Sequence, residues 1–550
     1  MKDIASMTIY QVYPRSFYDT NKDGVGDIPG VTAKLDYIQS LGIQMIWINP
    51  FYPSPQNDNG YDISNYTAID PLFGTMADFE ELVSEAKKRQ MGIMIDLVLN
   101  HTSTEHEWFQ KALAGDPYYR DFYYFREGRS DGSAPTNWES KFGGSAWEKL
   151  PNKNEYYLHL YDVTQADLNW ENRNVRQALY DVVHFWMTKG VSGFRLDVLN
   201  VISKPARFED DLLGDGKRFY TDGPKIHHYL KELHASTFGP LSLVTVGEMS
   251  STNVENCIRY SNPNEKELNM VFHFHHLKVD YKDGKKWQLD RVRFAELKEL
   301  FHSWQIEMAD GGGWDALFWN NHDQPRALGR FVSDKSEYHY QAATLLAATI
   351  HFMRGTPYVY MGEEIGMINP KFTEIDKYRD IETINHYNIL QNDGFTEQET
   401  MNIIKERSRD NSRIPMQWDS SHYAGFSSVE PFYPISDSKK WINVAESVTN
   451  EQSIFYFYKK LIQLRKELDV IQKGSYIPLY LEQERVISYL RKNDTTELLT
   501  IHYYGEEPVQ LQLPDHFLEA EILLSNSDRQ ELTKQIKLKP YETLAVIRQD

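Results

Sequence analysis

The stretch Gly193–Asn200 places two ionic side chains inside an apolar run. Arg195 and Asp197 alternate with apolar residues, a pattern typical of a short buried strand. Side chains two residues apart on a strand point to the same side, so the guanidinium would lie beside the carboxyl group and favour its ionised form. An ionised carboxylate can act as a nucleophile. An ion pair at the end of a strand would have the same sequence, and this octapeptide alone leaves both interpretations open.

Two further carboxyl groups follow apolar segments elsewhere in the chain. Glu248 stands in VGEM, and Asp323 stands beside His322 in NNHDQPR. A carboxyl group at an apolar strand end should have a raised pKa, which suits a general acid. Taken singly, each acid could be an ordinary rim residue, and His101 in DLVLNH could be a core histidine. Three acids and two histidines at strand ends make that interpretation of the whole set much weaker.

Two carboxyl groups of unlike pKa are the groups that hydrolyse glycosidic bonds. In this interpretation Asp197 attacks the anomeric carbon. Glu248 protonates the leaving oxygen and then activates water. Asp323 has no separate proton to move, so it would bind substrate hydroxyl groups and favour the cationic transition state.

The elements expected to position these residues alternate between short apolar runs and amphipathic helices. One helix should follow the candidate N-cap Thr75, with Asp78 in its first turn, and a second should span Asn174–Lys189. Eight strands, each followed by a helix, predict an α/β protein with a (β/α)8 TIM barrel and catalytic groups at the carboxyl ends of its strands. The candidate strands are Thr8–Tyr13, Ile43–Asn49, Met91–Leu97, Gly193–Val198, Leu241–Gly247, Leu268–Phe274, Ala316–Asn320 and Pro357–Tyr360.

The barrel pattern is interrupted twice and then replaced. Residues 1–100 and 174–470 are predicted to form the catalytic barrel, and residues 101–173 a lid domain inserted after the third strand. A polar, partly helical insertion is expected at about residues 365–426. After a helix at Ser453–Leu468, short alternating runs predict a C-terminal β-sandwich domain over residues 471–550. Its candidate strands are Tyr476–Leu481, Val486–Arg491, Leu498–Tyr504, Val509–Leu513 and Glu521–Leu524.

Composition limits the class of partner and the compartment. The chain has 550 residues, a formal net charge of -20 and a pI of about 5.4, which argue against nucleic acid or an anionic membrane as partner. A negatively charged small substrate would need a local basic pocket. The single cysteine, Cys257, excludes an internal disulfide and indicates the cytoplasm. No stretch is long and apolar enough for a membrane span, no signal peptide is expected, and the oligomeric state stays open, a monomer being compatible with the sequence.

An early loop carries oxygen side chains on alternate residues. In DTNKDGVGD, Asp19, Asn21, Asp23 and Asp27 would contribute side-chain oxygens and Val25 its carbonyl oxygen to a hard cation such as calcium. The spacing matches the start of an EF-hand loop, but Gly30 replaces the glutamate at the twelfth position. A polar turn without an ion is the alternative, and we favour a structural Ca²⁺. No organic cofactor is expected.

Four motifs in order resemble the α-amylase family of glycoside hydrolases. DLVLNH, GFRLDVLN, VGEM and WNNHDQPR carry the resemblance, and QADLNW, NGYDI and SRDNSRIPMQWD resemble its oligo-1,6-glucosidase branch. The resemblance implies a retaining, exo-acting α-glucosidase with Asp197 as nucleophile, Glu248 as acid/base and Asp323 as stabiliser, and it favours the calcium loop. It also implies that Arg409 or Arg413 pairs with Asp58 to close off the glucosyl subsite. The substrate-binding residues that follow from it are Asp58, Tyr61, His101, Phe142, Gln165, Arg195, His322, Arg409 and Arg413.

A basic run after the sixth strand distinguishes the chain within that branch. Met270–Trp287 contains Lys278, Lys282, Lys285 and Lys286, which we predict as a phosphate site because a dianion needs local cations in so acidic a protein. By charge pattern alone a solvated loop is the better interpretation. With GEMSST and GDGKRFYTDGP, however, the run resembles family members that cleave a phosphorylated disaccharide, α,α-trehalose 6-phosphate, into glucose and glucose 6-phosphate. The alternative substrate is a neutral isomaltose-type sugar. A non-catalytic relative is disfavoured because all three acids are present.

Overall fold

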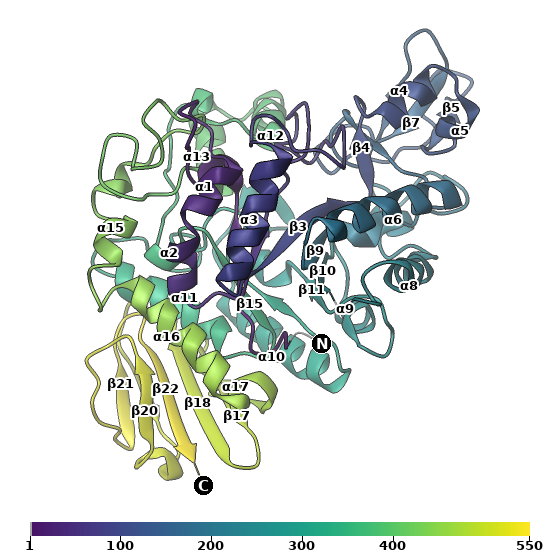
Figure 1. Cartoon of the computed structure of the whole chain (residues 1–550). Coiled ribbons are helices and arrows are strands. Elements are labelled where there is room, and N and C mark those ends of the chain that lie inside the picture. Colours follow the sequence, from purple (N-terminus) through teal and green to yellow (C-terminus); the bar gives the residue numbers. More distant parts are fainter. Residues whose placement is uncertain (1–2, 242, 550) are drawn as a thin grey trace.

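The computed structural model describes residues 3–241 and 243–549, and eight parallel strands form its centre (Figure 1). Their order is β11-β10-β9-β3-β2-β1-β15-β14, and the parallel bridge between Val271 and Asp315 nearly closes the barrel. The predicted (β/α)8 barrel and its eight strands are therefore confirmed. Of the expected strand Leu241–Gly247, Ser242 lies outside the described residues. The strands are β1 Ile9–Val12, β2 Met45–Ile48, β3 Gly92–Val98, β9 Gly193–Asp197, β10 Val244–Glu248, β11 Met270–Phe272, β14 Ala316–Leu317 and β15 Thr356–Tyr360.

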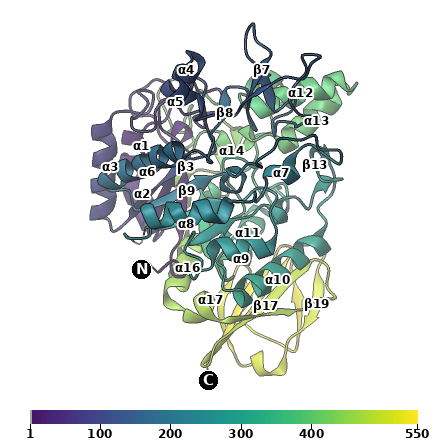
Figure 2. The same cartoon turned by 90° about the vertical axis from the view of Figure 1, so that its right-hand side faces the viewer.

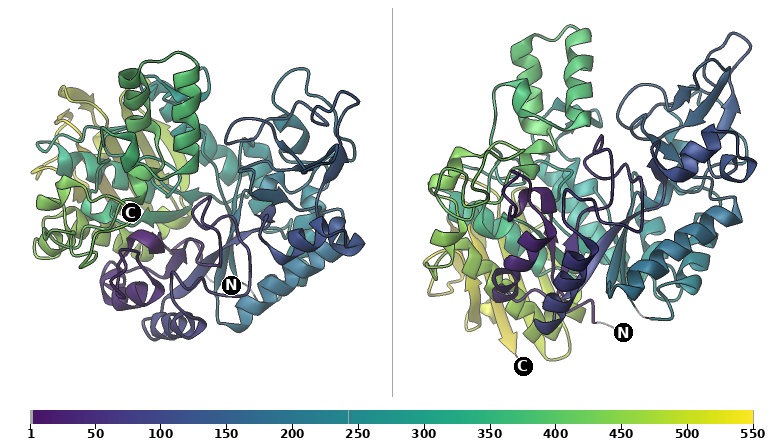
Figure 3. Two further views of the ribbon diagram at one scale, coloured as in Figure 1. Left: turned by 90° about the horizontal axis from the view of Figure 1, so that it is seen from above. Right: turned by 45° about the horizontal axis from the view of Figure 1, so that its top comes forward.

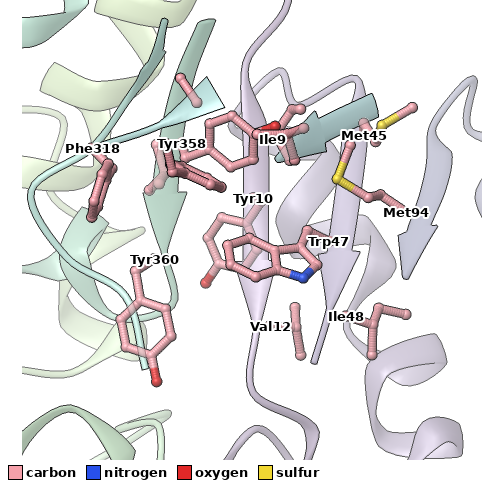
Figure 4. Close-up of a cluster of buried hydrophobic side chains, with 14 of the residues drawn as sticks. Ile9, Tyr10, Val12, Met45, Trp47, Ile48, Met94, Phe318, Tyr358 and Tyr360 are labelled. Atoms are coloured by element: carbon pink, nitrogen blue, oxygen red, sulfur yellow. The ribbon is translucent and has the colours of Figure 1, made fainter. Parts of the chain in front are cut away.

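The strands read as almost unbroken apolar runs because both of their faces are buried. Inside the barrel, the ring of Trp47 lies 6.0 Å from that of Tyr358, which in turn lies 4.6 Å from Phe272. Figure 4 shows Trp47 and Tyr358 with neighbouring side chains of β1, β2 and β15. Large aromatic side chains fill the interior, so the barrel is a packed core and the space for a ligand lies beyond the strand ends.

Helices surround the barrel, one or two after each strand (Figures 1 and 2). The helix expected after Thr75 has a capping box, in which the Thr75 hydroxyl accepts from the Asp78 amide and the Asp78 carboxylate accepts from that of Thr75. The predicted helix Asn174–Lys189 corresponds to α6. The surrounding helices are α1 Ile28–Ala33, α2 Leu35–Ser40, α3 Met76–Lys88, α6 Arg173–Thr188, α8 Ile226–Ser236, α9 Val254–Ser261, α10 Phe294–Asp310, α11 His339–His351 and α16 Ile454–Glu467.

The insertion after β3 begins and ends on a two-stranded antiparallel sheet. Strand β4, His101–Ser103, pairs with β8, Gln165–Asp167, and places Gln165 opposite Ser103. Between them lie α4 Glu107–Leu113, α5 Pro117–Arg120 and a sheet of β5 Phe125–Glu127, β6 Trp147–Lys149 and β7 Glu155–Leu158. A separate apolar cluster in this insertion includes Trp138 and Phe142 and extends to Val198 and Tyr220 after β9. The insertion is therefore packed onto the loop that follows the barrel's fourth strand.

A second group of elements stands on the same side of the barrel (Figure 3). After η3, His275–Leu277, a hairpin of β12 Tyr281–Lys282 and β13 Lys285–Leu289 shares an apolar cluster with two helices. These helices, α12 Ile381–Asn392 and α13 Glu397–Arg407, belong to the polar insertion expected at about residues 365–426. Trp287 of the hairpin, Leu390 of α12 and Ile404 of α13 are members of this cluster. The basic run and the second insertion thus form one packed unit.

The C-terminal region is all β, at the opposite end of the molecule from both insertions (Figure 2). It has a five-stranded antiparallel sheet in the order β16-β17-β18-β22-β20 and a two-stranded sheet, β19-β21. Tyr489 donates to the Thr349 carbonyl of α11, 2.7 Å away, and so ties this sheet to the barrel. The strands are β16 Ser475–Leu479, β17 Val486–Lys492, β18 Thr496–Tyr503, β19 Val509–Gln512, β20 Glu521–Ser525, β21 Gln535–Leu538 and β22 Thr543–Gln549.

The sequence pattern missed β21 and β22, although β22 lies inside the larger sheet between β18 and β20. The expected helix Ser453–Leu468 corresponds to α16, followed by the short α17, Asp469–Lys473. Among the described residues, no helix combines the length and apolar character that crossing a membrane requires.

Candidate active site

The carboxyl ends of the barrel strands open into a cavity of about 860 Å³, a volume that includes open solvent at its mouth. It is walled by the loops after β2, β3, β9, β10, β11, β14 and β15. Asp197 is the last residue of β9 and Glu248 the last of β10. The lining residues are Asp58, Tyr61, His101, Phe142, Tyr161, Asp197, Val198, Glu248, Ser250, Phe274, Leu277, Lys278, Tyr281, Lys286, Asp323, Gln324, Glu382 and Arg409.

One buried guanidinium holds the two predicted catalytic acids. Arg195 Nη1 donates to Asp197 Oδ1 at 2.5 Å, and Nη2 donates to Glu248. Arg195 also donates to Asp96, whose carboxylate accepts from Trp47 Nε1 at 2.8 Å and has no exposed surface. Because neighbouring nitrogens of one guanidinium bind them, Asp197 and Glu248 face the same cavity. Asp96 is therefore a buried structural carboxylate that holds the guanidinium of Arg195.

The backbone turns sharply directly after Asp197. Val198 has a φ of 39°, in the left-handed region that a β-branched residue rarely adopts. Such a conformation costs about 1–3 kcal/mol and persists only where its surroundings impose it. Here the Val198 side chain packs into the apolar cluster of the insertion after β3 and also lines the cavity. The turn therefore fixes both the end of β9 and one wall of the site.

Asp323 is held by a histidine and two arginines. His322 Nε2 lies 3.0 Å from Asp323 Oδ2, and Arg413 and Arg409 donate to Asp323 Oδ1 at 3.0 and 3.1 Å. The amide groups of Gln11 and Asn49 face His322 Nδ1 at 2.9 and 3.2 Å. Two donors at Nδ1 make that nitrogen the acceptor, so Nε2 carries the hydrogen and faces both the Tyr61 hydroxyl, 2.6 Å away, and Asp323.

Arg409 and Asp58 lie together on the cavity wall, at the end that we call the inner end. Its Nη2 donates to Asp58 Oδ1 at 3.2 Å, while Gln165 Nε2 donates to Asp58 Oδ2 at 3.0 Å. Gln165 Nε2 also lies 3.2 Å from His101 Nε2. The expected pairing of Asp58 with an arginine of the SRDNSR segment is thus made by Arg409. Arg413 contacts Asp323 instead and lies behind the wall.

The predicted substrate-binding residues fall into two groups. Asp58, Tyr61, His101, Phe142 and Arg409 line the cavity. The remaining four are buried behind it, where they hold lining residues: Gln165, Arg195, His322 and Arg413.

Burial and charge move the pKa values of these groups in different directions. Burial raises the pKa of Asp197, and the Arg195 charge opposes the rise without cancelling it. Arg195 thus favours ionisation as its position on the strand indicated, but burial is the larger effect. Burial also raises the pKa of Asp58 to about 8 against the opposing charge of Arg409. At Asp323 burial is more than offset by His322 and the two arginines, which hold its pKa well below the usual range.

The lysines of the basic run separate in space. Lys278 and Lys286 line the cavity, and we call their part of it the outer end. Lys282 and Lys285 lie instead on the exposed tip of the β12–β13 hairpin. Sequence reasoning missed Lys141, which comes from the insertion after β3 and donates to Ser250 Oγ at 2.8 Å. Burial and the charges of Lys217 and Lys278 lower the pKa of Lys141 to about 7. Within residues 3–241 and 243–549, no carboxylate lies within ion-pair distance of Lys141 or Lys278.

Several lining residues carried no chemical signal in the sequence. Tyr161, Phe274 and Tyr281 are aromatic side chains in a chain with 13% aromatic residues, so type alone did not single them out. Glu382 stands in a polar segment, far from any strand end. Ser250 belongs to the quoted GEMSST segment, so its position was marked although no role was predicted for it.

In the predicted calcium loop, several side-chain oxygens accept hydrogen bonds from nearby backbone amides. Asp19 accepts from the amides of Lys22 and Gly24 at 2.7 and 3.0 Å, and Asp27 caps α1 through the Gly30 amide at 2.6 Å. Asn21 Nδ2 donates to Asp23 Oδ2 at 2.9 Å. In the described part of the chain, no three His, Cys, Asp or Glu side chains are grouped to hold a metal, so an ion here would rely on amide and carbonyl oxygens as well. These hard oxygens suit Ca²⁺, and the calcium ion stays a prediction.

Two family descriptions match the chain. "Alpha amylase, catalytic domain" matches residues 11–474, and "Alpha-amylase SusG C-terminal domain" matches residues 486–545. The first covers more than half of the chain and all of the site.

Curated relatives and solved structures match almost the full length. The chain is 50% identical to a trehalose-6-phosphate hydrolase of Bacillus subtilis over 98% of this chain and 96% of the relative. It is 44% identical to an oligo-1,6-glucosidase of Parageobacillus thermoglucosidasius over 97% of each. The crystal structure of the trehalose-6-phosphate hydrolase of Bacillus licheniformis has a TM-score of 0.94 and 51% identity, with 99% of each chain covered.

Proposed function

The chain belongs to the α-amylase family of glycoside hydrolases, and from that premise we propose that it hydrolyses α,α-trehalose 6-phosphate to glucose and glucose 6-phosphate. The proposal rests on one observation: the two ends of a single cavity carry different charged groups. The inner end holds two carboxylic acids on a shared guanidinium. The outer end holds Lys278, which has no carboxylate partner among the described residues, and Lys286, which forms a salt bridge with Glu382.

The proposed chemistry follows the retaining route. Asp197 attacks the anomeric carbon, and Glu248 donates its proton to the bridging oxygen, so the second sugar leaves and a glucosyl–Asp197 ester remains. Glu248, now ionised, takes a proton from water, which attacks the same carbon and restores both acids. Retaining enzymes place their two acids about 5–5.5 Å apart. Support for this spacing comes from Arg195, because acids bound to adjacent nitrogens of one guanidinium cannot lie far apart.

Exo action follows from the closed inner end. Arg409 and Asp58 form a salt bridge across it, with the Asp58 carboxylate also held by Gln165. A glucose bound against this wall can have no further sugar attached on that side. Asp323, kept ionised by Arg409 and Arg413, is then available to accept from glucose hydroxyl groups and to stabilise positive charge at the reacting carbon.

The phosphate is the part of the substrate that the outer end selects. A dianion entering a protein of net charge -20 gains most from cations that carry no carboxylate partner. Among the described residues Lys278 and Lys141 meet that condition, whereas Lys286 forms a salt bridge with Glu382. We therefore propose Lys141, Lys278 and Lys286 as the phosphate-binding lysines and no longer include Lys282 and Lys285.

A comparison of substrates tests the proposal. We expect kcat/KM to be highest for trehalose 6-phosphate, lower for trehalose and lower still for isomaltose, measured as glucose released under one set of conditions. Isomaltose as the best substrate would instead support oligo-1,6-glucosidase activity, which the same acids can perform. The 44% identical relative of that name makes it the second candidate.

We also propose that Asp19, Asn21, Asp23, Asp27 and the Val25 carbonyl hold a structural calcium ion. Binding to the folded chain alone would stabilise it by mass action. Chelation by EGTA should then lower the thermal midpoint by about 2 °C or more, and added Ca²⁺, but not Mg²⁺, should restore it. An unchanged midpoint in EGTA would rule the ion out.

A further inference from the structure

A salt bridge joins an outer-end lysine to a carboxylate that also touches the inner end. Lys286 Nζ lies 2.6 Å from Glu382 Oε2. The same oxygen lies 3.3 Å from Nε of Arg409. Glu382 therefore offers one oxygen to two cations, one from each end of the cavity.

These groups are shielded from water. The side chains of Lys286, Glu382 and Arg409 are 18%, 10% and 8% exposed. Charges in such surroundings interact more strongly than at the surface, because little solvent screens them. A change in the contacts of the Glu382 carboxylate should therefore change how strongly it interacts with the Arg409 guanidinium.

Arg409 also contacts the carboxylates of the inner end, so a change in its position would affect them. Its Nη2 donates to Asp58 at 3.2 Å and its Nη1 to Asp323 at 3.1 Å. Asp380, the N-cap of α12, holds the same guanidinium through Nη2 at 2.5 Å and Nε at 3.1 Å. Glu382, two residues further on, stands in the first turn of α12. A continuous path of charged contacts thus runs from Lys286 to Asp58 and Asp323.

The backbone around this path is fixed by packing. Lys286 is on β13 and Glu382 is on α12, and both elements belong to the apolar cluster that includes Trp287 and Leu390. With the two backbones held, a new anion beside Lys286 can be accommodated only by the side chains. The Glu382 carboxylate is the group that must move, because it is the anion already beside Lys286.

We propose that Glu382 is a positioning residue that couples occupancy of the outer end by a phosphate dianion to the grip of Arg409 on the inner end. The inference rests on the proposed recognition of phosphate. A dianion that binds Lys286 repels Glu382, whose oxygen then turns wholly to Arg409. With a stronger contact to Glu382, the Arg409 guanidinium is better fixed, and it keeps Asp58 and Asp323 in place around the glucose. The phosphate thereby raises kcat as well as lowering KM, because its binding improves the site where bonds change.

The coupling implies a further activity. Neutral trehalose leaves Lys286 paired with Glu382 and should be a slow substrate. A separate dianion that occupies the outer end should then activate its hydrolysis. We expect inorganic phosphite to raise kcat/KM for trehalose by about tenfold at saturation, which corresponds to a modest gain in transition-state binding.

The experiment measures trehalose hydrolysis with increasing phosphite for the native chain, for Glu382→Gln and for the control Glu397→Gln. Glu397 is an exposed glutamate at the start of α13 whose carboxylate accepts from Tyr387. The native chain and the control should be activated alike. In Glu382→Gln phosphite should still compete with trehalose 6-phosphate but should no longer activate. Lys286→Gln breaks the pair from the other side and should also abolish activation, so the test stands if one variant fails to fold.

The outcomes separate this inference from the proposed function. If phosphite only inhibits the native chain or leaves trehalose hydrolysis unchanged, the coupling is wrong, and the preference for trehalose 6-phosphate is untouched. Full activation of Glu382→Gln would also contradict it. If the native chain shows no preference for trehalose 6-phosphate over trehalose, the proposed function fails and the coupling fails with it.

Discussion

The two ends of the cavity differ in how their charges are compensated. At the inner end every guanidinium meets several carboxylates: Arg195 contacts Asp96, Asp197 and Glu248, and Arg409 contacts Asp58, Asp323 and Asp380. At the outer end Lys141 and Lys278 have no such partner among the described residues. Compensated charges hold a fixed geometry, whereas uncompensated ones attract a ligand of opposite sign. The inner end is therefore built for the reaction and the outer end for the choice of substrate.

The largest effect is expected at the inner end, from Asp197→Asn. An amide cannot attack the anomeric carbon, so kcat should fall at least about 10⁴-fold on trehalose 6-phosphate and on p-nitrophenyl α-glucoside alike. Steady-state rates measure the loss, and thermal unfolding shows that the variant is folded. A folded variant that keeps about a tenth of the activity on either substrate would place the nucleophile elsewhere.

Glu248→Gln should separate the two substrates. The sugar leaving from trehalose 6-phosphate needs a proton, so its hydrolysis should slow by about 10²–10⁴-fold. p-Nitrophenolate leaves without protonation, so the first step on the aryl glucoside should be much less affected, and pre-steady-state release of nitrophenol should detect it. Equal loss of that first step on both substrates would contradict the role of Glu248 as the acid.

At the outer end, Lys141 should make recognition of phosphate depend on pH. Its pKa is lowered to about 7, so the cation is present below that pH and lost above it. kcat/KM reports the free enzyme, and for trehalose 6-phosphate it should fall above about pH 7 relative to kcat/KM for the aryl glucoside. Lys141→Arg, which stays charged, should remove this fall. Lys141→Met should raise KM for trehalose 6-phosphate about tenfold. A ratio that does not change with pH would exclude Lys141 from the phosphate site.

The last prediction compares a lysine that lines the cavity with a lysine on the exposed hairpin tip of the same basic run. Lys278→Ala should raise KM for trehalose 6-phosphate about tenfold, because a cation on the cavity wall is lost. Lys285→Ala, on the exposed hairpin tip, is the matched control and should leave KM within about twofold. Equal effects of the two substitutions would show that the phosphate lies over the hairpin tip and not inside the cavity.

The acids were predictable because their signal is local. Asp197 and Glu248 each end an apolar run, and a parallel barrel brings all such ends to one face, so residue type and strand position sufficed to bring them together. The same reasoning identified the eight barrel strands and α3, whose capping box is a property of neighbouring residues. It did not find β22, an inner strand of the C-terminal sheet that pairs with β18 and β20.

Amino-acid sequence by itself determined the barrel, the two acids and the surplus of lysines after the sixth strand. Only the tertiary structure decided which lysines face the cavity. It placed Lys282 and Lys285 on an exposed hairpin tip, Lys141 of the insertion after β3 against the cavity-lining Ser250, and Glu382 between Lys286 and Arg409. The physical reason is that a charge becomes part of a site only through what lies within a few ångströms of it. For residues from separate insertions, those distances exist only once the chain has packed.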